Sequence, residues 1–201
     1  SDLYFLFKLV PLIAGIYLSG LDWNGIDPAK FIGLDNYVAF FQDDLVLQAL
    51  KNNVLYAIGT VTGKIILSLG LALLLNQSLR GREFYRTALF MPVVISFVVV
   101  SILWAWLYNP QFGLINQVLK ALGLNWMILD WLGNPKIALW SLMVVDIWKW
   151  YGFHLVIFLA GLQTIPTELY EASSIDGASR WQSFLHITLP LLQPVMLVNV
   201  T

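Results

Sequence analysis

The stretch ALWSLMVVDIWKWYGFHLVIFLAGL, residues Ala138–Leu162, decides the fold class of this sequence. It is almost continuously apolar and contains only two charged residues, Asp146 and Lys149. A transmembrane helix needs about 20 consecutive, mostly apolar residues, whereas a transmembrane strand is shorter and alternates apolar with polar positions. The length and continuity of this stretch therefore predict a helix that crosses a membrane.

The composition of the whole chain also indicates a membrane protein. Of its 201 residues, 59% are hydrophobic and only 11% are charged, and the mean hydropathy is +0.74. A soluble domain has about 25% charged residues, so these values argue against a soluble enzyme and against a disordered chain. The net charge of −1 gives no basic surface for nucleic acid. The absence of cysteine leaves no disulfide and no thiol nucleophile.

Several stretches share the length and hydropathy of a membrane span. The expected spans are about 3–21, 53–75, 88–107 and 138–162, with the start of another at 189–201. We therefore expect an all-α fold, a polytopic transmembrane helical bundle that forms one domain over residues 1–201. The last stretch is too short to cross a bilayer, and the first follows neither an initiator methionine nor a basic flank. For these reasons we expect a fragment that is truncated at both ends.

The charges between the spans predict which side of the membrane each loop faces. The loop 76–87 is short and basic, with Arg80, Arg82 and Arg86 against a single acidic residue, Glu83. Cytoplasmic loops carry an excess of lysine and arginine, so this loop is expected in the cytoplasm. The other loops follow by alternation, which places 22–52 and 108–137 outside and 163–188 in the cytoplasm.

No motif in the sequence supports catalysis. Residues Gly59–Ile65 faintly resemble a phosphate-binding loop, but the spacing is one residue short and Ile65 stands where serine or threonine is required. The two histidines, His154 and His186, lie on different segments and lack partners at metal-ligand spacing. We therefore expect no catalytic residue, no bound metal and no cofactor on this chain.

The most informative polar pattern is ELYEASSIDGASRWQSFLHITLPLLQP, residues 168–194. Gly177 separates two segments that are patterned as short helices, and glycine commonly ends a helix in the left-handed conformation. The pattern predicts a rigid helix–glycine–helix elbow on the cytoplasmic face. Small residues in the elbow would let a partner approach closely; they are Ala172, Ser173 and Ala178. Acidic residues in it could pair with basic residues of the partner; they are Glu168, Glu171 and Asp176. Asp176 and Arg180 could instead form a local cap or ion pair.

This stretch resembles the EAA loop of ABC-importer permeases, the membrane subunits of binding-protein-dependent transporters. The family pattern is Glu-Ala-Ala, three residues, Gly, nine residues, then Ile-x-Leu-Pro. In this sequence the pattern is matched by Glu171-Ala172-Ser173, Gly177 and Ile187-Thr188-Leu189-Pro190, with the same spacing throughout. The one departure is Ser173 in place of the second alanine, which exchanges one small residue for another.

Other segments resemble the sugar-type branch of that family, the maltose and glycerol-3-phosphate permeases. They are Gly33–Tyr37, Leu79–Arg82 with Arg86–Thr87 and Met91–Pro92, Trp104–Asn116, Trp131–Gly133 and Phe158–Pro166. Together with the EAA loop, these segments extend the resemblance over essentially the whole chain. Members of the family carry further sequence at both ends, which agrees with the expectation of a fragment.

The resemblance implies a function and a set of partners. Two permeases, identical or paired, would form the pathway for a sugar or related solute that an extracytoplasmic binding protein delivers. Two ATP-binding subunits would hold ATP and Mg²⁺ and drive alternating access, and the chain would lie in a bacterial inner membrane. Docking to the ATPase would involve the coupling loop: Glu168, Glu171, Ala172, Ser173, Asp176, Gly177, Ala178, Arg180, Ile187, Leu189 and Pro190.

Three ionisable residues inside the expected spans, Lys64, Asp146 and Lys149, allow two interpretations. Charged groups in a membrane are costly and often functional, so all three could line a polar pathway. Alternatively, Asp146 and Lys149 could form a buried i,i+3 pair that fixes helix packing, or Lys149 could be a packing anchor beside Trp148 and Trp150.

Two alternative functions stay open at the level of sequence. The first is a permease for another class of solute, because a fold determines mechanism better than ligand. The second is a membrane scaffold or channel without coupling to ATP. An intramembrane enzyme is disfavoured because the chain offers no nucleophile or metal set.

Overall fold

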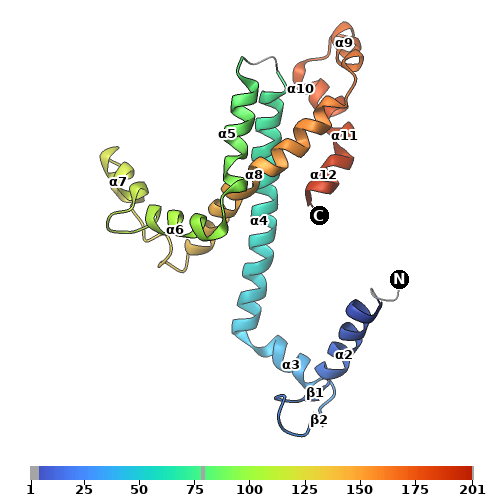
Figure 1. The fold of residues 1–201 in the computed structure, drawn as a ribbon, viewed down its shortest axis with the longest axis vertical. Helices are drawn as coiled ribbons and strands as arrows, with labels where there is room; N and C mark the ends of the chain where they lie inside the picture. The colour runs from blue at the N-terminus through green and yellow to red at the C-terminus, as the bar shows by residue number, and fades with distance from the viewer. Residues whose placement is uncertain (1–4, 78–79, 201) are drawn as a thin grey trace. The chain divides into compact units, whose positions relative to one another are not determined.

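The computed structural model describes residues 5–77 and 80–200 (Figure 1). The expectations that involve Leu3, Leu79 and Thr201 lie outside these described residues. The described chain divides into two compact units, Ser1–Leu55 and Tyr56–Thr201, and each is considered by itself. The all-helical fold is confirmed, since strand is confined to one two-stranded ribbon within the described ranges. The single domain over 1–201 stays a prediction.

The first unit consists of an apolar helix followed by a small polar cap. A π-helical turn, η1 (Phe5–Leu9), leads into α2 (Val10–Ser19), and the strands β1 (Leu21–Asp22) and β2 (Lys30–Phe31) pair antiparallel. Helix α3 (Asp35–Gln42) follows. The amide of Asn36 donates to the carbonyls of Ser19 and Leu21 at 2.9 Å each. These bonds hold α3 against the end of α2.

Helix α4 (Asp44–Leu75) is longer than the expected span 53–75 and begins about two and a half turns earlier. Asp43 explains the early start, because its carboxylate accepts from the backbone N–H groups of Leu45 at 2.8 Å and Val46 at 3.3 Å. Such a side-chain cap satisfies donors that a helix N-terminus leaves open. The polar residues after it do not interrupt the helix. The expected start at residue 53 was placed where the hydropathy rises, whereas the helix begins directly after its capping residue, Asp43.

The expected span 88–107 is wrong as one continuous helix. The structure has two helices there, α5 (Arg82–Val94) and α6 (Phe97–Leu107), which are bent by 95° at Ile95–Ser96. The hydroxyl of Ser96 accepts from the N–H of Val99 at 3.4 Å and caps α6. Hydropathy is continuous across the break, so apolar length alone could not reveal it.

The expected outer loop 108–137 is partly ordered by side chains. It contains α7 (Leu114–Ala121) and a 3₁₀ turn, η2 (Asn125–Met127). The indole of Trp131 donates to Asn116 at 2.8 Å, and the ring of Tyr108 stacks on Trp131 with centroids 5.8 Å apart. Burial raises the pKa of the Tyr108 phenol, whose O–H donates to the carbonyl of Ser141 at 3.1 Å. The loop is thereby fixed to the start of the next helix.

Helix α8 (Ala138–Gln163) matches the expected span 138–162 to within one residue. It packs against α5 (Figure 1) and forms the core of the second unit together with the end of α4. That core consists of Ala72, Leu75, Leu155, Phe158, Leu159, Leu162, Ile165 and Leu192. Among the described residues, α4 and α8 are long and apolar enough to cross a membrane, and the bent pair α5–α6 would make a third span.

Close packing around α8 depends on glycine. A β-carbon at Gly152 would overlap the backbone carbonyl of Leu89 in α5, and one at Gly59 of α4 would lie 2.8 Å from the sulfur of Met143. Small residues allow membrane helices to approach closely in this way. Gly152 was not singled out in the sequence, because nothing in a single chain distinguishes it from the other glycines.

The chain ends in a series of short helical segments. They are α9 (Thr167–Ile175), α10 (Arg180–Ser183), the π-helical turn η3 (Phe184–Thr188), α11 (Leu189–Leu191) and α12 (Gln193–Val200). The side chain of Asn199, which is buried, meets the ring nitrogen Nδ1 of His154 at 2.8 Å. This contact joins α12 to α8.

Candidate functional site

The predicted helix–glycine–helix elbow is present between α9 and α10. Gly177 has φ +78°, and the N–H groups of Gly177 and Ala178 donate to the carbonyls of Ser174 at 3.2 Å and Ser173 at 2.9 Å. These two bonds are those of a Schellman motif, which ends a helix and satisfies its last carbonyls. No atom would lie within 4 Å of a β-carbon at Gly177, so this position needs glycine for its backbone conformation and not for space.

The second arm of the elbow is capped and bonded to the first. Ser179 and Gln182 form a capping box at the start of α10, with bonds of 2.7 and 3.3 Å. Inside the elbow, the hydroxyls of Ser173 and Ser183 lie 3.0 Å apart. The hydroxyl of Tyr170 also lies 2.9 Å from that of the buried Thr188. These contacts make the elbow a defined unit and not a loose loop.

The outward surface of the elbow combines acidic and apolar side chains. Glu168, Glu171 and Asp176 are exposed. Ile175 at the end of α9 is 87% exposed and Trp181 on α10 is 66% exposed. Large apolar side chains exposed on an ordered elbow are typical of a contact surface.

The coupling-loop residues named from the sequence divide into outward and inward groups. Ala172 and Arg180 are exposed, whereas Ser173 and Ala178 are half-buried. Ile187 packs against the core, and Leu189 and Pro190 begin the final helices. Asp176 and Arg180 form no ion pair with each other, since the ion pairs within the described ranges are Lys64–Asp146 and Arg86–Glu83.

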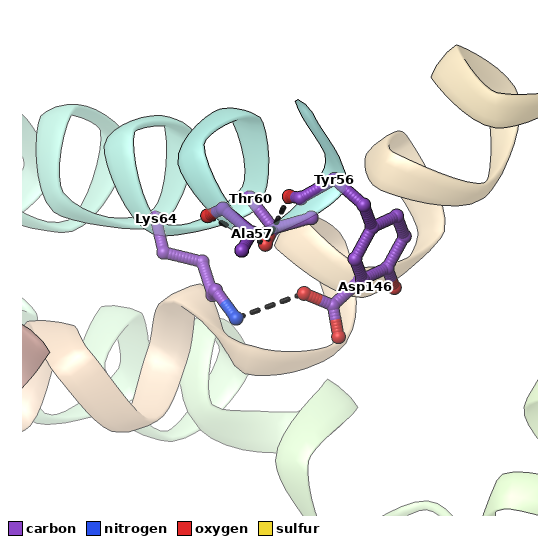
Figure 2. Close-up of polar contacts among 5 residues, drawn as sticks. All are labelled: Tyr56, Ala57, Thr60, Lys64 and Asp146. Carbon is purple, nitrogen blue, oxygen red and sulfur yellow. Dashed lines mark hydrogen bonds and ion pairs between the residues drawn. The ribbon is translucent and has the colours of Figure 1, made fainter. Parts of the chain in front are cut away.

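A second polar site lies between α4 and α8 (Figure 2). The ammonium of Lys64 lies 2.8 Å from Oδ2 of Asp146, and the two side chains are 16% and 21% exposed. The ring of Tyr56 lies beside Asp146, one turn from Thr60, whose hydroxyl donates to the Tyr56 carbonyl at 2.8 Å. The expected pairing of Asp146 with Lys149 is therefore wrong, because Asp146 faces α4.

Lys149 lies on another face of α8 and binds the end of α5. Its ammonium donates to the carbonyls of Pro92 at 2.8 Å and Val93 at 2.7 Å, and only 3% of the residue is exposed. It also lies 5.3 Å from the ring centroid of Phe97 and 5.2 Å from that of Trp150. A cation at a helix C-terminus satisfies open carbonyls and the helix dipole. Lys149 thus holds the break between α5 and α6, which agrees with the interpretation as a packing anchor.

These observations define a class of protein. The fold is a polytopic, all-α membrane fold with ionisable residues between its helices and an ordered elbow between α9 and α10. Within the described ranges, no group of three or more His, Cys, Asp or Glu side chains could hold a metal.

Comparison with known proteins identifies the family. A family model described as "Binding-protein-dependent transport system inner membrane component" matches residues 54–201. The chain therefore belongs to this family of ABC transporter permeases, as the EAA-type spacing predicted.

Individual relatives agree with this assignment. A probable ABC transporter permease protein of Bacillus subtilis, YurN, is 40% identical over 98% of this chain and 68% of its own length. The diacetylchitobiose uptake system permease protein NgcF of Streptomyces coelicolor is 37% identical over 95% of this chain and 57% of its own length. A chain in the crystal structure of a bacterial alginate ABC transporter in complex with an alginate pentasaccharide-bound periplasmic protein superimposes with a TM-score of 0.78. It is 27% identical and is matched over 97% of this chain and 65% of its own length. The chain thus spans less than two thirds of the length of two of these three relatives.

Proposed function

We propose that the chain is part of the permease subunit of an ABC importer for a sugar or oligosaccharide. The names of relatives support this solute class, since one belongs to a diacetylchitobiose uptake system and a similar structure comes from an alginate ABC transporter. A solute-binding protein outside the membrane would deliver the sugar, as the periplasmic protein in the alginate complex suggests. A second permease subunit, identical or paralogous, would complete the pathway.

ATP hydrolysis is assigned to separate subunits in this proposal. Two ATP-binding subunits would carry ATP and Mg²⁺, and this chain would act without catalysis of its own. Binding of ATP and of the solute-loaded protein would each favour one orientation of the pathway, which is what alternating access requires.

The observation that carries the proposal is the ordered elbow of α9, Gly177 and α10. Its exposed Ile175 can enter an apolar groove on an ATP-binding subunit, while the exposed Glu168 and Glu171 can pair with basic residues around that groove. A fixed knob of this kind transmits a displacement, whereas a flexible loop would absorb it. Docking is the role that this geometry supports best.

Site-directed crosslinking tests the proposal. These 201 residues lack cysteine, so Ala172→Cys, made in the full-length parent protein, introduces the one thiol in this part of the chain, on the exposed face of α9. Paired with a cysteine in the groove of the ATP-binding subunit, it should form a disulfide in membranes whose yield changes with ATP. Lys136→Cys, exposed on the expected outer loop, is the matched control and should not crosslink.

The outcomes separate the alternatives. Crosslinking together with uptake of a labelled oligosaccharide supports the proposal in full. Crosslinking without uptake of any sugar indicates a permease for another solute class. If both proteins are present and folded but no crosslink forms, the scaffold or channel function becomes the better explanation.

A further inference from the structure

Helix α7 exposes an apolar stripe. Leu114, Val118 and Leu122 recur at every fourth position and therefore lie on one side of the helix. Their exposed fractions are 47%, 47% and 68%. The residue that α7 buries is polar, since only 6% of Asn116 is exposed. A helix on a water-facing surface has the opposite arrangement, with its apolar stripe inward and its polar residues outward.

A series of side-chain contacts holds α7 to the start of α8. The amide of Asn116 donates to the carbonyl of Leu129 at 2.9 Å and accepts from the indole of Trp131 at 2.8 Å. The ring of Trp131 stacks on Tyr108, whose hydroxyl donates to the carbonyl of Ser141 in the first turn of α8. Helix α8 is long and apolar enough to cross a membrane, so its start lies at a membrane surface. These contacts therefore hold α7 at that surface.

The chain around α7 has the composition of a membrane interface. Lys120 is the only charged residue in 109–129. It follows Val118 by two positions, which is about 200° around the helix, so it does not interrupt the apolar stripe. Trp140 in the first turn of α8 is 53% exposed, and tryptophan is enriched where a span meets the lipid headgroups. A soluble protein partner would be expected to meet a more polar rim.

We propose that α7 lies in the membrane interface, with Leu114, Val118 and Leu122 inserted among the lipid acyl chains near the headgroups. Interfacial helices bury their apolar side about 5–10 Å below the headgroup boundary. The ammonium of Lys120 stays among the headgroups and water, because it lies on the other side of the helix. The expected outer loop 108–137 is thus anchored to lipid as well as to α8. This placement depends neither on the solute nor on the ATP-binding subunits.

Spin labels at two positions of α7 test the placement. Val118→Cys and Lys120→Cys are made separately in the full-length parent protein, with any other cysteine replaced by serine, and each is labelled with a nitroxide in phosphatidylcholine nanodiscs. The label at 118 should collide with oxygen, which dissolves in lipid, several times more often than with a water-soluble nickel chelate. The label at 120 is the matched control on the same helix and should collide mainly with the chelate.

Two results would overturn the proposal. A label at 118 that neither reagent reaches means that a protein, such as a second permease subunit, covers the stripe. A label at 118 that the chelate reaches as readily as the label at 120 means that the stripe faces water. Leu114→Cys repeats the test at a second point of the stripe, so that a local defect in one variant does not decide the result.

Fluorescence quenching measures the depth independently. A bimane label at position 118 should be quenched more strongly by a lipid that carries its nitroxide near the headgroup than by one that carries it near the end of the acyl chain. The same label at position 120 should be quenched weakly by both lipids. Equal quenching at the two depths, or none at position 118, would contradict an interfacial helix.

Discussion

Lys64 of α4 and Asp146 of α8, which lie 82 residues apart in the sequence, form an ion pair of 2.8 Å between Nζ and Oδ2. Lys149, almost one turn further along α8, binds the backbone of α5 instead. The two charged side chains of α8 therefore face different neighbours and tie this helix to both of them. Ionisable groups inside a membrane are costly, and each of these has a partner that offsets the cost.

Breaking the Lys64–Asp146 pair should destabilise the protein more than removing both charges. Lys64→Met leaves Asp146 partly buried without its partner, and the loss of one partner of a buried pair costs about 3 kcal/mol. The double variant Lys64→Met/Asp146→Leu should recover most of that loss. Unfolding by SDS titration measures the free energies. Strictly additive effects of the two single variants would contradict direct pairing.

Lys149→Met should loosen the break between α5 and α6. The carbonyls of Pro92 and Val93 would lose a charged donor, and each hydrogen bond to a charged group contributes about 1.5–3 kcal/mol to stability. Spin labels at the exposed positions Ala88 and Ile102 can report the distance between the two helices by electron resonance. We expect a broader distance distribution in the variant. An unchanged distribution would mean that Ser96 and packing alone fix the angle.

Gly177→Ala should weaken the elbow by about 1–2 kcal/mol, because a β-carbon disfavours the left-handed conformation. The space around Gly177 is open, so the cost is one of backbone conformation alone. Gly70→Ala in α4 is the matched control, since its surroundings are equally open and its φ is not positive. At position 70, alanine should stabilise helix α4 by up to about 1 kcal/mol relative to glycine. Hydrogen exchange over 167–183 should rise in the first variant only.

Gly152→Ala should destabilise the contact between α5 and α8. The added methyl group would overlap the carbonyl of Leu89, and backbone atoms cannot yield as a flexible side chain can. Overpacking of this kind costs about 1–3 kcal/mol. Gly15→Ala, at a position with open space, should not lower the thermal stability of the protein. A normal melting temperature for the Gly152 variant would mean that α5 shifts to accommodate it.

Periodicity and composition predicted the parts of the fold that depend on apolar length. Ala138–Leu162 was predicted to within one residue of α8, and Gly177 was predicted as a left-handed helix end. The break in 88–107 was missed because the group that binds its open carbonyls, the ammonium of Lys149, comes from more than 50 residues away. The partner of Asp146 was missed for the same reason. Contacts between helices are set by tertiary packing, which a local pattern in one chain does not encode.

The hydroxyl contacts inside the elbow determine how a load on α9 would spread. Tyr170 meets the buried Thr188, and Ser173 meets Ser183, so α9 is bonded at two points to the segment that leads into α12. A force on the exposed tip at Ile175 must then either move that segment as well or break both contacts. In mechanical terms α9 and α10 form one lever. The π-helical turn Phe184–Thr188, which follows α10, is part of the load path, because Thr188 at its end forms the contact with α9.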